Sequence, residues 1–82
     1  MSLTIAINGE NRRLEDLATP SSLAQVIGEL GLKGDRIAVE HNGQIIVRGL
    51  WPGTRVEEGD RLEIVHFVGG GSGLRPRSKR WS

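Results

Sequence analysis

The sequence predicts an α+β domain in which a mixed sheet of four to five strands packs on one helix. Segment 3–7 alternates apolar and polar residues with the period of a strand, and segment 61–68 is a second apolar strand. Segment 23–30 has its apolar residues at the spacing of one helix face. Asn-Gly pairs at 8–9 and 42–43 are typical of two-residue hairpin turns, because both residue types tolerate positive φ. A chain of 82 residues has room for one such domain.

The first hairpin pairs an apolar strand with a polar one. Leu3, Ile5 and Ile7 share one face of the first strand. The returning strand, 10–14, is short and charged. We expect it at an edge of the sheet, because charges there discourage pairing with another chain.

The helix carries signals at both ends. Ser22 is a good N-cap residue, and Gln25 stands three residues on, as in a capping box. Gly31 suits the left-handed position that ends a helix. Gly28 in the helix interior costs about 1 kcal/mol relative to Ala, so we interpret it as a close approach of the helix to the sheet.

The second half of the chain returns to strands. Segment 37–39 is the third strand, and the Asn42-Gly43 turn leads into a fourth strand at 44–47. The glycines and proline of segment 49–53 argue against a regular element there, and we expect Trp51 to anchor this loop on the core.

The order of elements is β-β-α-β-β-β, with the most apolar strands, 3–7 and 62–67, at its two ends. Because a buried parallel pair explains their apolar character, we expect these two strands side by side in the middle of the sheet. The last strand turns Leu62 and Ile64 to the core and Phe67 to the other face. This architecture is that of a ubiquitin-like β-grasp spanning residues 1–68.

The charge changes sharply after this domain. Residues 1–71 carry a net charge of −3, whereas residues 72–82 carry four basic residues and no acid. The tail 72–82 also lacks periodicity, so we expect it to be disordered. A nucleic-acid role for the tail is the weaker interpretation, because the body is acidic. With no apolar run of membrane length and no secretory signal at the start, we expect a cytoplasmic protein without a membrane partner.

The residue types for catalysis are poorly represented. There is no cysteine, and His41 and His66 stand on different strands, where we expect both at the surface and neither in a metal site. Glu57, Glu58 and Asp60 share one turn, and solvation explains them without acid–base chemistry. We therefore predict no catalytic residue and no metal site.

The glycine run 69–73 follows the last strand directly. A phosphate-binding loop does not fit, because neither Gly-x-Gly-x-x-Gly nor the Walker pattern is present and no helix follows. Two interpretations stay open on composition alone. The run is either a flexible linker to the tail or a thread, Gly69 to Gly71, that enters a narrow channel in a partner.

The ending Ile64-Val65-His66-Phe67-Val68-Gly69-Gly70-Gly71 resembles the ThiS family, the sulfur carrier proteins of thiamine biosynthesis. Further similarity lies in 56–63 and in 3–9, and the resemblance covers residues 1–71. A diglycine ending on a β-grasp is shared with the small subunit of molybdopterin synthase and with ubiquitin-like modifiers. The form Val-His-Phe-Val-Gly-Gly-Gly is typical of the thiamine branch.

The resemblance implies a carrier that is a protein cosubstrate and not an enzyme. A ThiF-like adenylating enzyme would use ATP to activate the carboxylate of Gly71, with Gly69 and Gly70 as the thread. Cysteine-derived sulfur would convert the adenylate to a thiocarboxylate, which donates sulfur to thiazole synthase. The carrier itself would bind no cofactor. By the same analogy, Val65 and Phe67 would form an exposed apolar docking patch for the partners.

The chain departs from the family in the eleven residues 72–82 that follow Gly71. An internal glycine has no free carboxylate to activate, so either a processing protease removes the tail first or the tail is a gene-boundary feature. Two alternatives remain: a non-covalent β-grasp interaction module whose glycines are a linker, and a sulfur carrier of the molybdopterin route.

Overall fold

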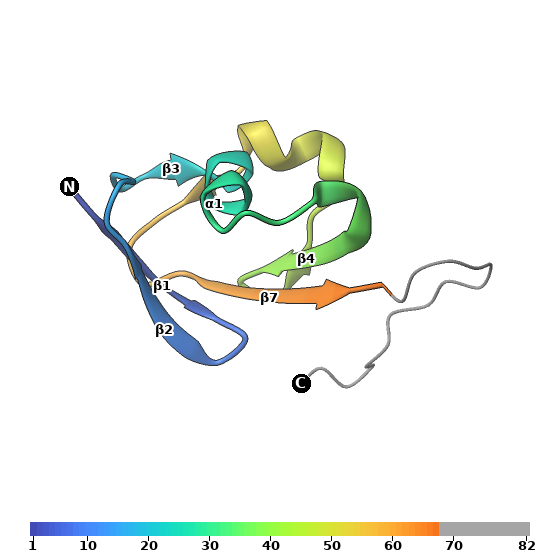
Figure 1. Cartoon of the computed structure of the whole chain (residues 1–82), viewed down its shortest axis with the longest axis horizontal. Helices are drawn as coiled ribbons and strands as arrows, with labels where there is room; N and C mark the ends of the chain where they lie inside the picture. The colour runs from blue at the N-terminus through green and yellow to red at the C-terminus, as the bar shows by residue number, and fades with distance from the viewer. Residues whose placement is uncertain (68–82) are drawn as a thin grey trace.

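The computed structural model describes residues 1–67, which form a five-stranded sheet, a two-stranded sheet, one α-helix and two 3₁₀ helices. The helix α1 lies across one face of the large sheet, next to the 3₁₀ helix η2 (Figure 1). No helix in this part of the chain is long and apolar enough to cross a membrane. In chain order the elements are β1 (Leu3–Ile7), β2 (Glu10–Leu14), β3 (Ser21–Ser22), α1 (Leu23–Glu29), η1 (Gly34–Arg36), β4 (Ile37–His41), β5 (Gln44–Ile45), η2 (Arg48–Gly53), β6 (Arg55–Val56) and β7 (Arg61–His66).

The large sheet has the strand order β2-β1-β7-β4-β5, and the small sheet pairs β3 with β6. Strands β1 and β7 run parallel, and every other pair in the large sheet is antiparallel. The first and last strands of the domain therefore lie side by side inside the sheet, and β2 is at an edge. Both predictions are confirmed.

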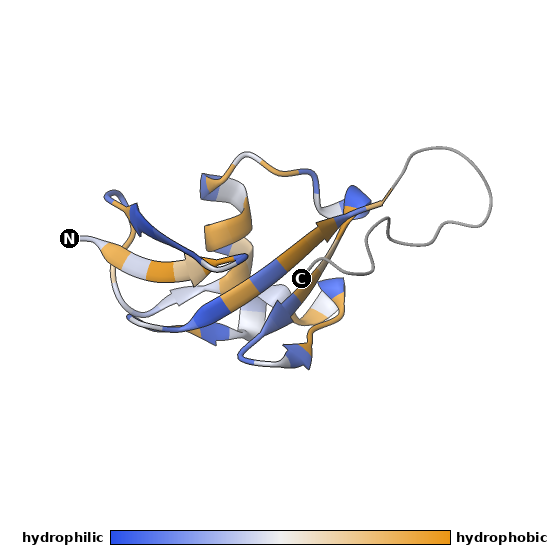
Figure 2. Cartoon of the chain, turned by 90° about the horizontal axis from the view of Figure 1, so that it is seen from below, coloured by the Kyte–Doolittle hydropathy of each residue, from blue (hydrophilic) through white to orange (hydrophobic). Residues whose placement is uncertain are grey.

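The core lies between α1 and the large sheet. On β1, buried residues alternate with partly exposed ones, and the alternating hydropathy of the strands is visible in Figure 2. Each large apolar side chain that is fully buried contributes about 1.5–3 kcal/mol relative to exposure. The side chains that are at most 1% exposed include Leu3, Ile5, Leu23, Val26, Val39, Val56 and Leu62.

Asn8 ties the first hairpin to β7. It adopts φ 51° and is followed by Gly9 at φ 85°, the positive values that the Asn-Gly turn requires. Its side-chain Oδ1 accepts from the backbone N–H of Ile64 at 2.7 Å, and its Nδ2 donates to the carbonyl of Ile64 at 3.0 Å. The amide side chain thus continues the β1–β7 pairing where the chain turns away into the hairpin.

The ends of α1 are those that the sequence predicts. The backbone N–H of Gln25 donates to Ser22 Oγ at 3.0 Å, and Gln25 Oε1 accepts from the backbone N–H of Ser22 at 2.9 Å. Gly31 has φ 74°, and the N–H of Leu32 donates to the carbonyl of Ile27 at 3.3 Å. This is a capping box at one end and a Schellman motif at the other.

The interpretation of Gly28 as a close contact between helix and sheet is wrong. An ideal Cβ at Gly28 would meet no atom within 4 Å. Val26 and Ile27 face the core, and the next residue along the helix turns away from it. Gly28 therefore borders open space in the hollow between α1 and η2.

The prediction of irregular structure at 49–53 is also wrong, because Arg48–Gly53 forms the 3₁₀ helix η2. A 3₁₀ turn needs bonds only between residues three apart, so it tolerates a short run containing Gly and Pro. The N–H of Leu50 donates to the carbonyl of Val47 at 2.9 Å. The expected anchor is confirmed: Trp51 is 5% exposed, and its Nε1 donates to the carbonyl of Ile46 at 2.9 Å.

The fourth strand is shorter than predicted. Strand β5 covers only Gln44–Ile45, both exposed, instead of 44–47. Beyond it the chain must turn toward η2, and Val47 lies 60% exposed at the start of that helix.

Candidate functional site

The candidate site begins where β7 ends. The backbone N–H of Phe67 donates to the carbonyl of Arg36 at 3.0 Å, so pairing with the β4 side of the sheet continues to the last described residue. The predicted thread Gly69, Gly70 and Gly71 and the tail 72–82 lie outside the described residues. Backbone pairing with β4 and with Arg36 thus holds β7 in place as far as Phe67.

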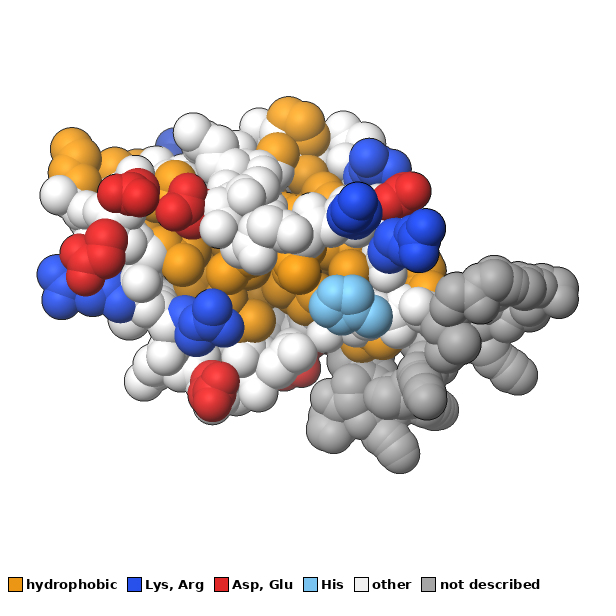
Figure 3. Space-filling model, viewed as in Figure 1, with side chains coloured by type: hydrophobic (Ala, Val, Ile, Leu, Met, Phe, Trp, Pro, Cys, Tyr) orange, Lys and Arg blue, Asp and Glu red, His pale blue; other side chains and the backbone are white. Residues whose placement is uncertain are grey.

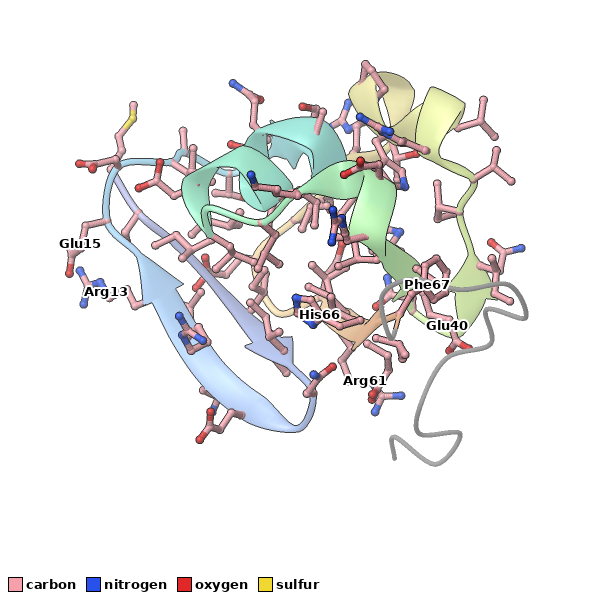
Figure 4. All side chains as sticks on the ribbon, turned by 45° about the vertical axis from the view of Figure 1, so that its right-hand side comes forward. Arg13, Glu15, Glu40, Arg61, His66 and Phe67 are labelled. Atoms are coloured by element: carbon pink, nitrogen blue, oxygen red, sulfur yellow. The ribbon has the colours of Figure 1, made fainter. Side chains whose placement is uncertain are left out.

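The two faces of β7 differ as the sequence predicts. Leu62 and Ile64 are 1% and 5% exposed and face the core under α1. The register of β7 against β4 pairs Val65 with Ala38 and Glu63 with Glu40. These residues lie on the face of the sheet that is turned away from α1. His66 is exposed and Phe67 half-buried. Figure 4 shows Phe67 and His66 pointing in different directions at the end of β7.

The expected exposure of Val65 is wrong. Val65 is only 4% exposed, although it is not part of the core cluster between α1 and the sheet. A side chain on a central strand has flanking neighbours on both sides, and this shields a short side chain even on the open face. The accessible apolar surface at this end of β7 therefore comes from Phe67.

Neighbouring strands complete this surface. Glu40 on β4 pairs with both Glu63 on β7 and Ile45 on β5, which puts the three side chains on one face with Phe67. Ile45 is 73% exposed. We call Glu40, Ile45, Arg61, Glu63 and Phe67 the outer sheet face; it combines apolar side chains with two carboxylates and one guanidinium. Sequence reasoning missed Glu40 and Ile45, because only the register between strands reveals them.

A second correction concerns His41 and the acidic turn. His41 was expected at the surface and Asp60 in solvent, but their side chains are 15% and 20% exposed. His41 Nε2 and Asp60 Oδ2 lie 2.8 Å apart, and the backbone N–H of Glu57 donates to the same carboxylate oxygen at 2.8 Å. Burial opposes the charge of Asp60, yet the hydrogen bonds from Glu57, His41 and Asn42 outweigh it and lower the pKa of its carboxyl.

The contact between His41 and Asp60 has a structural role. It joins the turn at 42–43 to the turn that precedes β7, where the backbone N–H of Arg61 also donates to Asn42 Oδ1 at 2.8 Å. Within residues 1–67 no three His, Asp or Glu side chains come together as metal ligands.

The comparison with family models decides the assignment. The model described as "ThiS family" matches residues 5–71, which is most of the chain and ends at the third glycine of the run. This chain belongs to the ThiS family. The resemblance on the residues from Ile64 to Gly71 is confirmed.

Two curated relatives are longer proteins that contain a segment similar to this chain. A thiazole synthase of Paramagnetospirillum magneticum is 40% identical over 70 residues, covering 85% of this chain and 21% of the relative. A thiazole synthase of Magnetococcus marinus is 32% identical over 80 residues, covering 98% of this chain and 23% of the relative. The chain thus spans about a fifth of the length of these relatives.

A solved structure confirms the fold. The thiamine biosynthesis protein ThiS from Geobacter metallireducens superposes with a TM-score of 0.71 at 27% identity. The match covers 84% of this chain and all of that one. The mixed five-stranded sheet on one helix is therefore the β-grasp of ThiS proteins.

Proposed function

We propose that this ThiS-family chain is a sulfur carrier of thiamine biosynthesis, acting in the cytoplasm as a protein cosubstrate and not as an enzyme. The observation that carries the proposal is the family match running to Gly71. The similarity to thiazole synthases and to a thiamine biosynthesis protein favours the thiamine route over the molybdopterin route.

The proposed chemistry takes place at a terminal Gly71. Its carboxylate attacks the α-phosphate of ATP on a ThiF-like adenylating enzyme and releases pyrophosphate. A sulfide equivalent derived from cysteine then attacks the carbonyl carbon and displaces AMP, which leaves a thiocarboxylate. The thiocarboxylate gives its sulfur to the substrate of thiazole synthase. The acyl carbon gains an oxygen atom from the acceptor or from water as the C–S bond breaks, which returns the carrier to the carboxylate. ATP is bound by the activating enzyme and not by the carrier.

The position of the glycines suits this task. Extended chain from Phe67 to Gly71 reaches about 15 Å beyond the sheet at about 3.3 Å per residue. Glycine lacks a side chain, so Gly69 to Gly71 fit a channel too narrow for other residues. Because β7 is held inside the sheet, the folded domain provides a rigid attachment point for this thread.

The outer sheet face is the proposed docking surface beside the thread. Phe67 and Ile45 supply apolar contact area. Glu40, Arg61 and Glu63 supply charged groups for polar contacts with a partner. Phe67, rather than the buried Val65, makes the main apolar contact in this proposal.

The eleven residues after Gly71 must be absent for this chemistry. We propose that a protease removes residues 72–82 and exposes the Gly71 carboxylate. Mass spectrometry of the protein isolated from its own cell tests this. The proposal expects a chain ending at Gly71, partly heavier by the difference between one sulfur and one oxygen atom. Only chains that retain residues 72–82, with no sulfur gain, would contradict it and favour a non-covalent interaction module.

A further inference from the structure

The outer sheet face is left uncovered by the other elements of residues 1–67, because α1, η2 and the small sheet all pack on the opposite side of the large sheet. On the open side Ile45 is 73% exposed and Phe67 is half-buried. Val47 extends this apolar strip. Since Ile46 packs against the core, strand alternation turns Val47, which is 60% exposed, the same way as Ile45. Such an exposed apolar strip is typical of a surface that a further segment covers.

Two carboxylates stand in the middle of this face. Glu40 and Glu63, which we call the acidic pair, are direct partners in the register of β4 against β7, so their Cβ atoms lie about 4.5–5.5 Å apart. Like charges directly opposite each other destabilise a sheet. Within residues 1–67 neither carboxylate takes part in an ion pair, although Arg61 lies on the same face two residues before Glu63. A cation from a further segment would therefore relieve the repulsion between the two carboxylates.

The other charges near β7 lie toward its two ends. Where the strand ends, Phe67 pairs with the backbone of Arg36, and Lys33 and Arg36 stand on either side of Asp35 in the chain. Figure 3 shows Lys and Arg side chains gathered with one acidic side chain at the end of the molecule that carries η1. At its start β7 carries Arg61. A basic segment is therefore attracted to the acidic pair and repelled at both ends of the strand.

The chain itself contains a segment with the complementary charge. Residues 72–82, outside the described residues, hold no acid. Their basic residues, which we call the basic run, are Arg75, Arg77, Lys79 and Arg80. Leu74 and Trp81 add an apolar side chain before and after the basic run, which complements the apolar strip beside the acidic pair.

The chain after Phe67 is long enough to return along β7. Four of the five residues 69–73 are glycine, which lets a backbone reverse its direction because glycine adopts positive φ. A return over residues 74–78 spans the same four steps as 63–67, about 13 Å at about 3.3 Å per residue. It brings the basic run to the level of the acidic pair, past the uncharged residues that stand beside the basic end of the strand. A tether this short gives a high effective concentration, so a weak contact suffices.

We propose that residues 74–82 of this chain dock on its own outer sheet face, with the basic run against the acidic pair and Leu74 on the apolar strip. The consequence rests on the proposed function. Residues 72–82 would cover the surface proposed for the adenylating enzyme. Their removal would uncover this surface in the same step that frees the Gly71 carboxylate.

The test follows the rate of trypsin cleavage after Arg77 and Lys79 in the full 82-residue chain, measured by mass spectrometry. Docking protects these bonds, because the protease cuts only the undocked segment. The double variant Glu40→Gln, Glu63→Gln removes both charges of the acidic pair and keeps the shape of the side chains. The matched control is Glu10→Gln, Glu29→Gln, which makes the same charge change at two exposed residues outside the outer sheet face. Thermal melts establish that all three proteins are folded.

The expected result is cleavage about threefold faster or more in the acidic-pair variant and an unchanged rate in the control. Added salt should speed cleavage of the native chain more than that of the acidic-pair variant, because it screens the charges. Equal rates in all three proteins overturn the proposal. Protection that grows with protein concentration also overturns it, because the segment then docks on a second copy. The assay uses neither ATP nor the adenylating enzyme, so a failure of the carrier function is read separately, from adenylation of the chain ended at Gly71.

Discussion

The two faces of β7 divide stability from recognition. The inner face, with Leu62 and Ile64, packs under α1 and belongs to the core. The outer face, with Glu63 and Phe67, is only partly covered and adjoins the exposed Ile45. Val65 departs from this division, because it is buried on the outer face. A single strand can therefore hold the fold on one side and present a partner surface on the other, while its central position buries one outer residue.

Ile64→Ala, on the inner face of β7, should have the largest effect on stability. Ile64 is 5% exposed within the core cluster, so truncation removes buried apolar area and leaves a cavity. We expect a loss of about 2–5 kcal/mol in the free energy of unfolding. Urea denaturation measures it, and a loss below that of Phe67→Ala would reverse the assignment of the faces.

Val65→Ala tests the exception on the outer face. Because Val65 is 4% exposed, removing its methyl groups should cost about 1–2 kcal/mol. The measurement is again chemical denaturation, beside an adenylating-enzyme binding assay. Unchanged stability together with weakened binding would show Val65 to be a partner contact, as the family resemblance implied.

Asp60→Asn tests the contact between Asp60 and His41. This contact holds the start of β7 and does not depend on the side chains of either face of that strand. The pKa of Asp60 is lowered in the folded state, so its charge stabilises the fold above the unfolded pKa of about 4. That contribution is lost as the pH falls below about 4 and through the folded pKa. Stability of Asp60→Asn, followed by thermal melts from pH 6 to about pH 2.5, should fall less steeply with acid than that of the native chain. Parallel curves would contradict the role of the Asp60–His41 pair.

Phe67→Ala should have the smallest effect on stability, under about 1 kcal/mol, because the residue is half-buried beyond the core cluster. Its effect should appear instead as weaker binding to the adenylating enzyme. Calorimetric binding to that enzyme checks this, with Met1→Ala, an apolar truncation at an 89% exposed residue, as control. Binding equal to the control would remove Phe67 from the docking surface.

The parts of this fold that sequence predicts are locally encoded. The Asn8-Gly9 turn and the Ser22–Gln25 capping box depend on residues within three positions of one another, and both form as expected. The parallel central pair follows from apolar content alone, because only a strand flanked on both sides hides so many apolar side chains.

The missed features depend on residues that meet across the fold. The pairing of His41 with Asp60 requires the register of β4 against β7, which brings together residues nineteen positions apart. The composition of the outer sheet face depends on the same register. Gly28 was misinterpreted because helix position alone does not show which side of α1 is crowded.

Pyrophosphate exchange with the adenylating enzyme and ATP tests the central claim, that a terminal Gly71 is the reacting group. Three proteins are compared: the full chain, the chain ended at Gly71, and that shorter chain with Gly71→Ala. Adenylation needs the terminal carboxylate beside the α-phosphate, and eleven further residues move it as much as ~35 Å along an extended chain. We expect rapid exchange for the chain ended at Gly71, little for its Gly71→Ala variant, and none for the full chain. Equal exchange by the full chain would contradict the need for trimming, and no exchange by any of the three would contradict the carrier function.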